Sequence, residues 1–91
     1  MRVSLSDTAE MDVAGIYAYV AQRSPDQAER VVRAILSAAQ GLAHFPLMGR
    51  VGATPGTRER LMTRYPYKIV YIITGDEIEV ARVIHMAQDW P

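Results

Sequence analysis

The sequence predicts a single α+β domain in which a strand and a helix hairpin precede a three-stranded antiparallel meander. Two segments in the first half have apolar side chains at helical spacing, and later segments are rich in β-branched and aromatic residues. Helices that are segregated along the chain from antiparallel strands are typical of a two-layer α+β fold. A chain of 91 residues suits one such domain, so we assign 1–91 to it.

A short strand and the first helix are expected at the start of the chain. Residues 2–6 alternate weakly between polar and apolar side chains, which is typical of a short strand. Ser6 or Asp7 can cap the helix that follows, and Asp7 with Glu10 three residues later resembles a capping box. One apolar stripe then follows at helical spacing: Val13, Ile16, Tyr17 and Val20.

The second helix has the clearest start signal in the chain. Ser24 can cap it, Pro25 suits the first helical position, and Asp26 favours the positive end of the helix dipole. Its apolar stripe consists of Ala28, Val31, Val32, Ile35, Ala39 and Leu42. Because only a few residues separate the two helices, we expect them to fold back as an antiparallel hairpin.

The remainder of the chain predicts a long surface loop and then the meander. Residues 44–57 combine glycines with prolines, which predicts a loop without regular structure. Strands are expected over 58–63, 67–74 and 78–85, with a tight turn at Gly75-Asp76 between the last two.

The strand expected over 67–74 is apolar on both of its faces. Ile69, Tyr71 and Ile73 alternate along it with Val70 and Ile72. The helix hairpin can cover only one of these faces. We therefore expect the other face to be covered by the C-terminal tail, by another strand or by a partner protein.

The composition excludes several kinds of site. The chain has no cysteine, so disulfides and zinc–thiolate sites are excluded. The two histidines, His44 and His85, are far apart in the sequence and no carboxylates cluster near them, so we expect no metal ion and no cofactor. No segment is apolar over the length that a membrane span requires. A net charge of zero argues against nucleic-acid binding through bulk electrostatics.

The basic residues are nevertheless concentrated in one part of the chain. This basic stretch holds Arg50, Arg58, Arg60, Arg64 and Lys68, and only Glu59 opposes them. Arginine binds carboxylates and phosphates through a planar fork of donors, so the stretch suits an acidic partner or a phosphate backbone. A solvated basic strand face is the alternative interpretation.

Several short motifs occur in a fixed order along the whole chain. They are Ala14, Ile16 and Tyr19, Pro46 with Gly49-Arg50, Thr57-Arg58-Glu59, Tyr65-Pro66-Tyr67-Lys68-Ile69-Val70-Tyr71, Ile78-Glu79-Val80, Arg82-Val83-Ile84-His85 and Asp89-Trp90-Pro91. Together with the expected order of elements, they resemble the RelE/ParE family of bacterial toxins. Met86 departs from the pattern, because many relatives have glycine after the histidine.

This resemblance implies a RelE-like fold and a cytoplasmic bacterial protein that is encoded with an antitoxin. The antitoxin's C-terminal segment would wrap the toxin in a toxin–antitoxin hetero-oligomer. Antitoxin tails are often acidic, and the second apolar sheet face requires a cover. We therefore expect the antitoxin to bind Arg58, Arg60, Arg64, Lys68, Val70 and Ile72.

The resembled family divides by target into two functional classes. One class poisons DNA gyrase without known catalysis of its own, and the other cuts messenger RNA on the ribosome. The relatives that cut RNA carry further basic residues and a tyrosine beyond the last strand, whereas this chain has Asp89 in that region. We therefore favour the gyrase poison and keep the ribosome-dependent endoribonuclease as the alternative.

Each class points to its own site residues. For a gyrase poison, we expect target contact through Met86, Gln88, Asp89 and Trp90, with Trp90 either as an aromatic anchor or as a cover for the edge of the sheet.

A ribonuclease instead needs an acid, a base and a cation that stabilises the phosphorane. Its candidates are Arg58, Lys68, Arg82 and His85. Strand alternation puts Arg82 and His85 on opposite faces. A paired, partly buried Arg82 and a His85 that caps or packs at the strand end are the structural alternatives.

Overall fold

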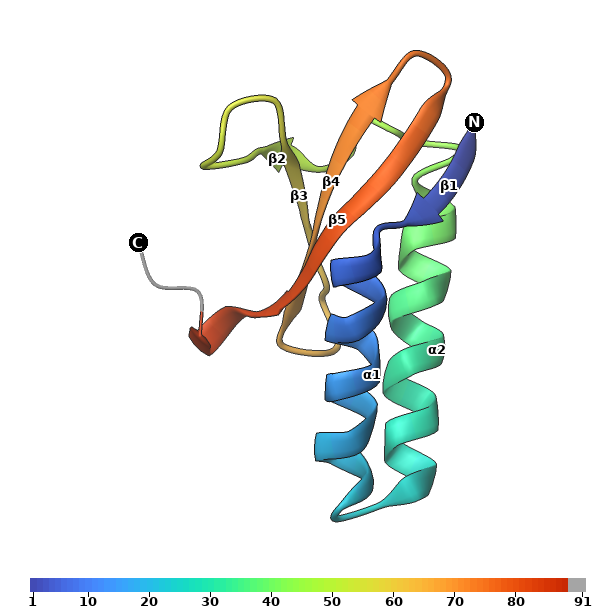
Figure 1. The fold of residues 1–91 in the computed structure, drawn as a ribbon, viewed down its shortest axis with the longest axis vertical. Helices are drawn as coiled ribbons and strands as arrows, with labels where there is room; N and C mark the ends of the chain where they lie inside the picture. The colour runs from blue at the N-terminus through green and yellow to red at the C-terminus, as the bar shows by residue number, and fades with distance from the viewer. Residues whose placement is uncertain (89–91) are drawn as a thin grey trace.

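The computed structural model describes residues 1–88, in which a helix hairpin covers one face of a five-stranded sheet (Figure 1). The elements follow in the order β1 (Arg2–Leu5), α1 (Asp7–Ala21), α2 (Pro25–Gly41), β2 (Arg50–Val51), β3 (Arg58–Leu61), β4 (Tyr67–Thr74), β5 (Glu77–His85) and the 3-10 helix η1 (Met86–Gln88). The predicted two-layer α+β fold is confirmed. Within these residues, no helix is both long and apolar enough to span a membrane.

The sheet has the strand order β1-β5-β4-β3-β2. Strands β3, β4 and β5 form the predicted antiparallel meander, while β1 joins β5 in parallel and β2 joins β3 antiparallel. Strand β2 lies within residues 44–57, so the prediction of a loop without regular structure was wrong there. Its two residues, Arg50 opposite Glu59 and Val51 opposite Arg58, are too few to produce an alternation that the sequence could reveal.

Serine side chains start both helices. Ser6 Oγ accepts from the backbone N–H of Ala9 at 3.0 Å, and Ser24 Oγ accepts from that of Gln27 at 3.2 Å. Ser6 rather than Asp7 is therefore the cap of α1, and the Ser24-Pro25 start of α2 is confirmed.

The core lies between the helix hairpin and β3, β4 and β5 of the sheet. In α2, the predicted stripe is buried apart from Val32, which is half-buried. In α1, only Ala9 is fully enclosed, Val13 and Ile16 pack against the core from its margin, and Tyr17 is 43% exposed. The first helix is thus apolar on more sides than the core covers, because Met11, Tyr17 and Tyr19 remain exposed.

The two apolar faces of β4 have different surroundings. Ile69 and Tyr71 are fully buried under the helices. Val70 and Ile72 are half-buried on the opposite side. We call this second side the helix-free face; the strand pairing places Glu59, Lys68, Val70 and Ile72 on it. Within the described residues, the helices therefore cover one face of the sheet and leave the other without a helix, as expected from the alternation.

Candidate functional site

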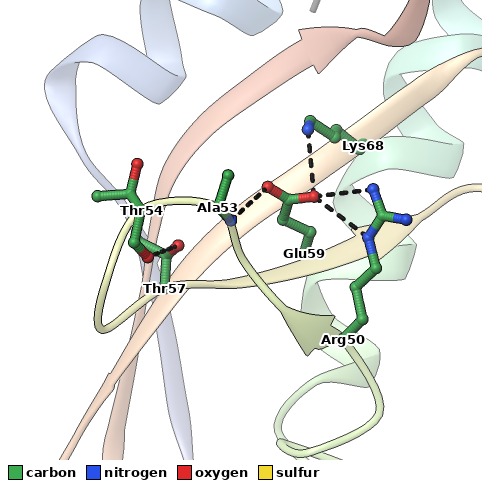
Figure 2. A network of polar contacts seen from close by, with 6 residues as sticks. All are labelled: Arg50, Ala53, Thr54, Thr57, Glu59 and Lys68. Atoms are coloured by element: carbon green, nitrogen blue, oxygen red, sulfur yellow. Dashed lines mark hydrogen bonds and ion pairs between the residues drawn. The ribbon is translucent and has the colours of Figure 1, made fainter. Parts of the chain in front are cut away.

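A buried ion pair lies at the centre of the helix-free face. Lys68 Nζ lies 3.1 Å from Oε1 of Glu59, and their side chains are only 5% and 8% exposed. Arg50 approaches the same carboxylate oxygen from β2, with its Nη2 at 3.1 Å and its own side chain 61% exposed. Figure 2 shows both cations converging on Glu59 from different strands.

The Glu59 carboxylate also holds the loop between β2 and β3. Its Oε2 atom accepts from the backbone N–H of Ala53 at 3.4 Å, and the loop is closed by a bond from Gly52 N–H to the carbonyl of Thr57 at 2.8 Å. Burial by itself raises the pKa of Glu59, but hydrogen bonds from Lys68, Arg50 and Ala53 outweigh it, so the pKa lies below its ordinary value. Glu59 is therefore ionised near neutral pH and neutralises two members of the basic stretch (Figure 2).

On the opposite side of the sheet, Arg58 and Tyr71 fix the loop that follows α2. Arg58 Nη1 donates to the carbonyl of Gly49 at 2.8 Å. The Tyr71 hydroxyl donates to the carbonyl of Pro46 at 2.7 Å and accepts from the N–H of Gly49 at 3.0 Å. A Cβ atom at Gly49 would lie 2.6 Å from the Tyr71 hydroxyl oxygen, so this close approach requires glycine.

Arg82 forms a two-bond pair with Asp12 of α1. Its Nε atom lies 2.8 Å from Oδ2 of Asp12, and its Nη2 atom lies 3.2 Å from Oδ1. Asp12 Oδ2 also accepts from the backbone N–H of Val83 at 2.9 Å, on the part of β5 that extends beyond its pairing with β1. The hydrogen bonds that Arg82 donates to the Asp12 carboxylate raise the pKa of Arg82, so its guanidinium stays protonated.

His85 packs and caps at the end of β5. Its ring meets Tyr67 edge to face, with ring centroids 5.2 Å apart and an interplanar angle of 87°. Its Nδ1 atom accepts from the N–H of Ala87 at 3.1 Å, so the neutral ring carries its proton on Nε2. Burial, and then the nearby Tyr19, raise the pKa of Tyr67.

Two depressions are relevant to binding. The first, between α1 and the end of β5, has a volume of about 620 Å³ and is lined by Tyr19, Tyr67, Arg82 and His85 among others. The second, between α2 and the end of β3, has a volume of about 400 Å³ and includes Arg60 and Arg64. Among residues 1–88, no group of three His, Cys, Asp or Glu side chains could hold a metal ion.

The comparisons with known proteins identify the family. The family model described as the ParE toxin of type II toxin–antitoxin systems matches residues 3–90. This chain belongs to the ParE toxin family. It is 42% identical over 76 residues to the candidate toxin Y4kP of Sinorhizobium fredii, covering 84% of this chain and 78% of that protein. It is 35% identical over 77 residues to the toxin RelE2 of Caulobacter vibrioides, covering 85% of each.

Solved structures of ParE and RelE relatives share the fold. A chain of the chromosomal ParDE toxin–antitoxin system of P. aeruginosa superposes with a TM-score of 0.83 at 26% identity, covering 93% of this chain and 95% of that one. A chain of the RelBE2 toxin–antitoxin complex of Mycobacterium tuberculosis gives a TM-score of 0.66 at 23% identity, covering 92% and 95%. The second likeness supports the fold alone.

In this ParE-family toxin, the four nuclease candidates do not converge on one site. Lys68 lies on the helix-free face, whereas Arg58 points to the helix side and bonds to the loop after α2. Arg82 and His85 both line the depression beside α1, although they alternate on β5 as predicted. Sequence reasoning missed Asp12, which looked like one of several acids in α1. Its position one helical turn before Ile16, beside the apolar stripe, was the available signal.

The residues expected to contact an antitoxin fall into separate regions. Arg60 and Arg64 line the depression beside α2, Arg58 holds the loop, and Val70 and Ile72 lie on the helix-free face with the buried Lys68. These residues therefore lie on both sides of the sheet, because alternation along β3 turns Arg58 and Arg60 to the side opposite Glu59.

The residues expected to contact the target are described only in part. Met86 is half-buried and begins η1, which also includes Gln88. Asp89 and Trp90 lie outside the described residues.

Proposed function

We propose that this protein is a growth-inhibiting toxin that poisons DNA gyrase in the bacterial cytoplasm and is neutralised by a cognate antitoxin. The observation that carries the proposal is the engagement of all four nuclease candidates in structural contacts. Lys68 pairs with Glu59, Arg82 pairs with Asp12, Arg58 bonds to the Gly49 carbonyl, and His85 caps Ala87. A toxin that acts only by binding its target does not require any of these four side chains to leave its structural contact.

Cleavage of RNA would require a different arrangement. An acid, a base and a cation must all lie within hydrogen-bond reach of one phosphate. Lys68 is 4% exposed and lies beneath the loop that Glu59 holds, while Arg58 is on the other side of the sheet. The zero net charge also suits contact with ribosomal RNA poorly. These features favour a protein target over a nucleic-acid substrate.

Two observations support an antitoxin partner. Both structural relatives come from toxin–antitoxin systems, the ParDE system and the RelBE2 complex. In addition, the helix-free face leaves Val70 and Ile72 only half-buried, and large apolar side chains around α2 are exposed. Apolar surface of this kind on a small protein is typical of a binding site.

Purified gyrase provides the direct test. Adding the toxin to gyrase, ATP and plasmid DNA should trap cleaved DNA that is covalently joined to the enzyme. The Lys68→Met and His85→Ala variants should trap it as well, provided that they fold. If no cleaved DNA accumulates while the same preparation cuts messenger RNA on purified ribosomes, the gyrase proposal is wrong.

A ribosome-dependent messenger-RNA endoribonuclease is the second candidate function. The depression beside α1 favours it, because Tyr19, Tyr67, Arg82 and His85 all line this space of about 620 Å³. A doubly protonated His85 could donate its Nε2 proton to a leaving oxygen, which would require Nδ1 to give up its bond from the Ala87 N–H, and Arg82 could stabilise negative charge. If this function is correct, His85→Ala should abolish RNA cleavage, whereas Tyr17→Phe, an exposed control on α1, should not.

A further inference from the structure

The outward side of α1 carries almost no charge. From Met11 to Gln22 the sequence holds one charged residue, Asp12, which is paired with Arg82. Met11 is 74% exposed and Tyr19 is 71% exposed. A helix that is apolar on nearly all sides is typically covered on all sides, whereas α1 meets the core with one side only. Its outward side is therefore a candidate contact surface.

The second helix of the hairpin has a different outward side. Four charged residues line a depression there: Asp26, Glu29, Arg30 and Arg33. Arg33 Nη2 lies 2.8 Å from Oε1 of Glu29, and both side chains are exposed. Exposed charges paired at helical spacing are typical of a side that water covers. The uncharged outward side is thus particular to α1.

Exposed residues at a spacing of four form one row along α1. The row consists of Asp7, Met11, Gly15, Tyr19 and Arg23. The Ser24 N–H donates to the Val20 carbonyl at 3.0 Å, so the helical spacing continues as far as Arg23. Residues four apart are neighbours on the surface of a helix. The row therefore has apolar residues at its centre, a carboxylate at one end and a guanidinium at the other.

We propose that this row is the contact between two copies of the chain, whose α1 helices cross in antiparallel orientation at Gly15. Residues at equal distances before and after Gly15 then meet across the contact. Met11 lies beside the partner's Tyr19, and Asp7 lies toward the partner's Arg23. Each of these contacts occurs twice, as a two-fold axis requires. The row is thus complementary to itself in both hydrophobicity and charge.

The centre of the row allows a close approach. A Cβ atom added at Gly15 meets nothing within 4 Å, so the glycine leaves open space at the crossing point. Small residues at the contact let two helices approach to about 8 Å between their axes. Met11, Gly15 and Tyr19 also line the depression beside α1, which offers a concave surface to a side chain of the second copy.

The charge of the whole chain also favours a second copy as the occupant. Because the net charge is zero, two copies do not repel each other at long range. The inference is independent of the proposed target, since it concerns only how copies of this chain associate.

Sedimentation velocity of the purified full chain over a range of concentrations provides the first test. We expect the unaltered chain to form a reversible dimer. Tyr19→Glu should raise the dimer Kd at least tenfold, because it places a charge in an apolar contact. Leu47→Glu is the matched control and should leave the Kd unchanged, since Leu47 is 65% exposed in the loop after α2. Thermal unfolding of each variant shows whether it is folded.

A charge exchange provides the second test. Asp7→Arg and Arg23→Asp each place like charges at both ends of the row, so each variant should dimerise several-fold more weakly than the unaltered chain. When the two variants are mixed, every end contact again joins a carboxylate to a guanidinium. We therefore expect a mixed dimer that is tighter than the dimer of either variant alone, and salt should reduce this difference.

The remaining outcomes overturn the proposal. If the unaltered chain is a monomer at every concentration, α1 does not join two copies. If it dimerises and Tyr19→Glu dimerises equally well, the copies meet through another surface. If the Asp7→Arg and Arg23→Asp variants do not combine preferentially, the antiparallel crossing at Gly15 is wrong.

Discussion

Lys68 and Glu59 form an ion pair of 3.1 Å on the helix-free face, with 5% and 8% of their side chains exposed. A buried charge is stable only when an opposite charge lies beside it, and Glu59 provides that charge for Lys68. The Glu59 carboxylate also accepts hydrogen bonds from the Arg50 guanidinium and the Ala53 N–H. Lys68, one of the four nuclease candidates, is thus part of the framework that holds β2 and its loop.

Removing Glu59 should destabilise the protein far more than removing its exposed partner. We expect Glu59→Leu to lower the free energy of unfolding by about 3–5 kcal/mol, because it removes the buried carboxylate that pairs with Lys68 and holds Arg50 and the Ala53 N–H. Arg50→Ala should lower it by less than about 1 kcal/mol, since the Arg50 side chain is 61% exposed. Urea unfolding of the purified variants measures both values, and equal losses would contradict the account.

Stability should depend on pH through Glu59. Its pKa in the folded state lies below the ordinary value of 4.5, so its contribution is fully present above that value and is lost as pH falls through the folded pKa. We expect the unaltered chain to lose stability more steeply below about pH 4.5 than Glu59→Gln does. Denaturant midpoints between pH 3 and pH 7, about the range over which carboxyls titrate, make the comparison. Parallel curves for the two proteins would rule out this role for Glu59.

The Tyr71 hydroxyl should stabilise the loop after α2. Tyr71→Phe removes the acceptor for the buried Gly49 N–H and the donor to the Pro46 carbonyl. We expect a loss of about 1–3 kcal/mol, the cost of a buried polar group without a partner. Tyr17→Phe is the matched control, because Tyr17 is 43% exposed. The midpoint temperature of thermal unfolding measures the loss in each variant. Equal midpoints for Tyr71→Phe and Tyr17→Phe would show that the Tyr71 hydroxyl has no such role.

Asp12 should matter both for charge and for backbone pairing. Asp12→Asn keeps an acceptor for the Val83 N–H but weakens the pair with Arg82, whereas Asp12→Ala loses both contacts. We expect the alanine variant to lose about 1–3 kcal/mol and the asparagine variant about 1 kcal/mol or less, because Arg82 is half-exposed. Hydrogen exchange at the Val83 amide should accelerate only in the alanine variant. Equal acceleration in both would mean that the charge, not the acceptor, protects the edge of β5.

The sequence was sufficient for the elements whose signals are local. The Ser24 cap, the α2 stripe and the alternation along β4 each depend on neighbouring residues, and the structure contains all three. The position of β1 could not be predicted in the same way, because its parallel pairing joins Arg2 to Glu77 across most of the chain.

The site was less predictable for a related reason. Alternation alone could separate Arg82 from His85 within one strand, but it could not reveal that Glu59 and Lys68, on different strands, become partners through the register of β3 with β4. The pairing of Arg82 with Asp12 also joins residues that are distant in the sequence. Such pairs follow from tertiary packing, so a single sequence carries only their charges and not their contacts.

The most direct test of the central claim follows macromolecular synthesis in bacteria just after the toxin is induced without its antitoxin. Labelled precursors of DNA and of protein are measured together over the first minutes. The account predicts that DNA synthesis stops first and that gyrase-linked DNA breaks appear. If protein synthesis stops first and messenger RNA is found cut on ribosomes, the toxin is a ribonuclease and the depression that holds Arg82 and His85 is its active site.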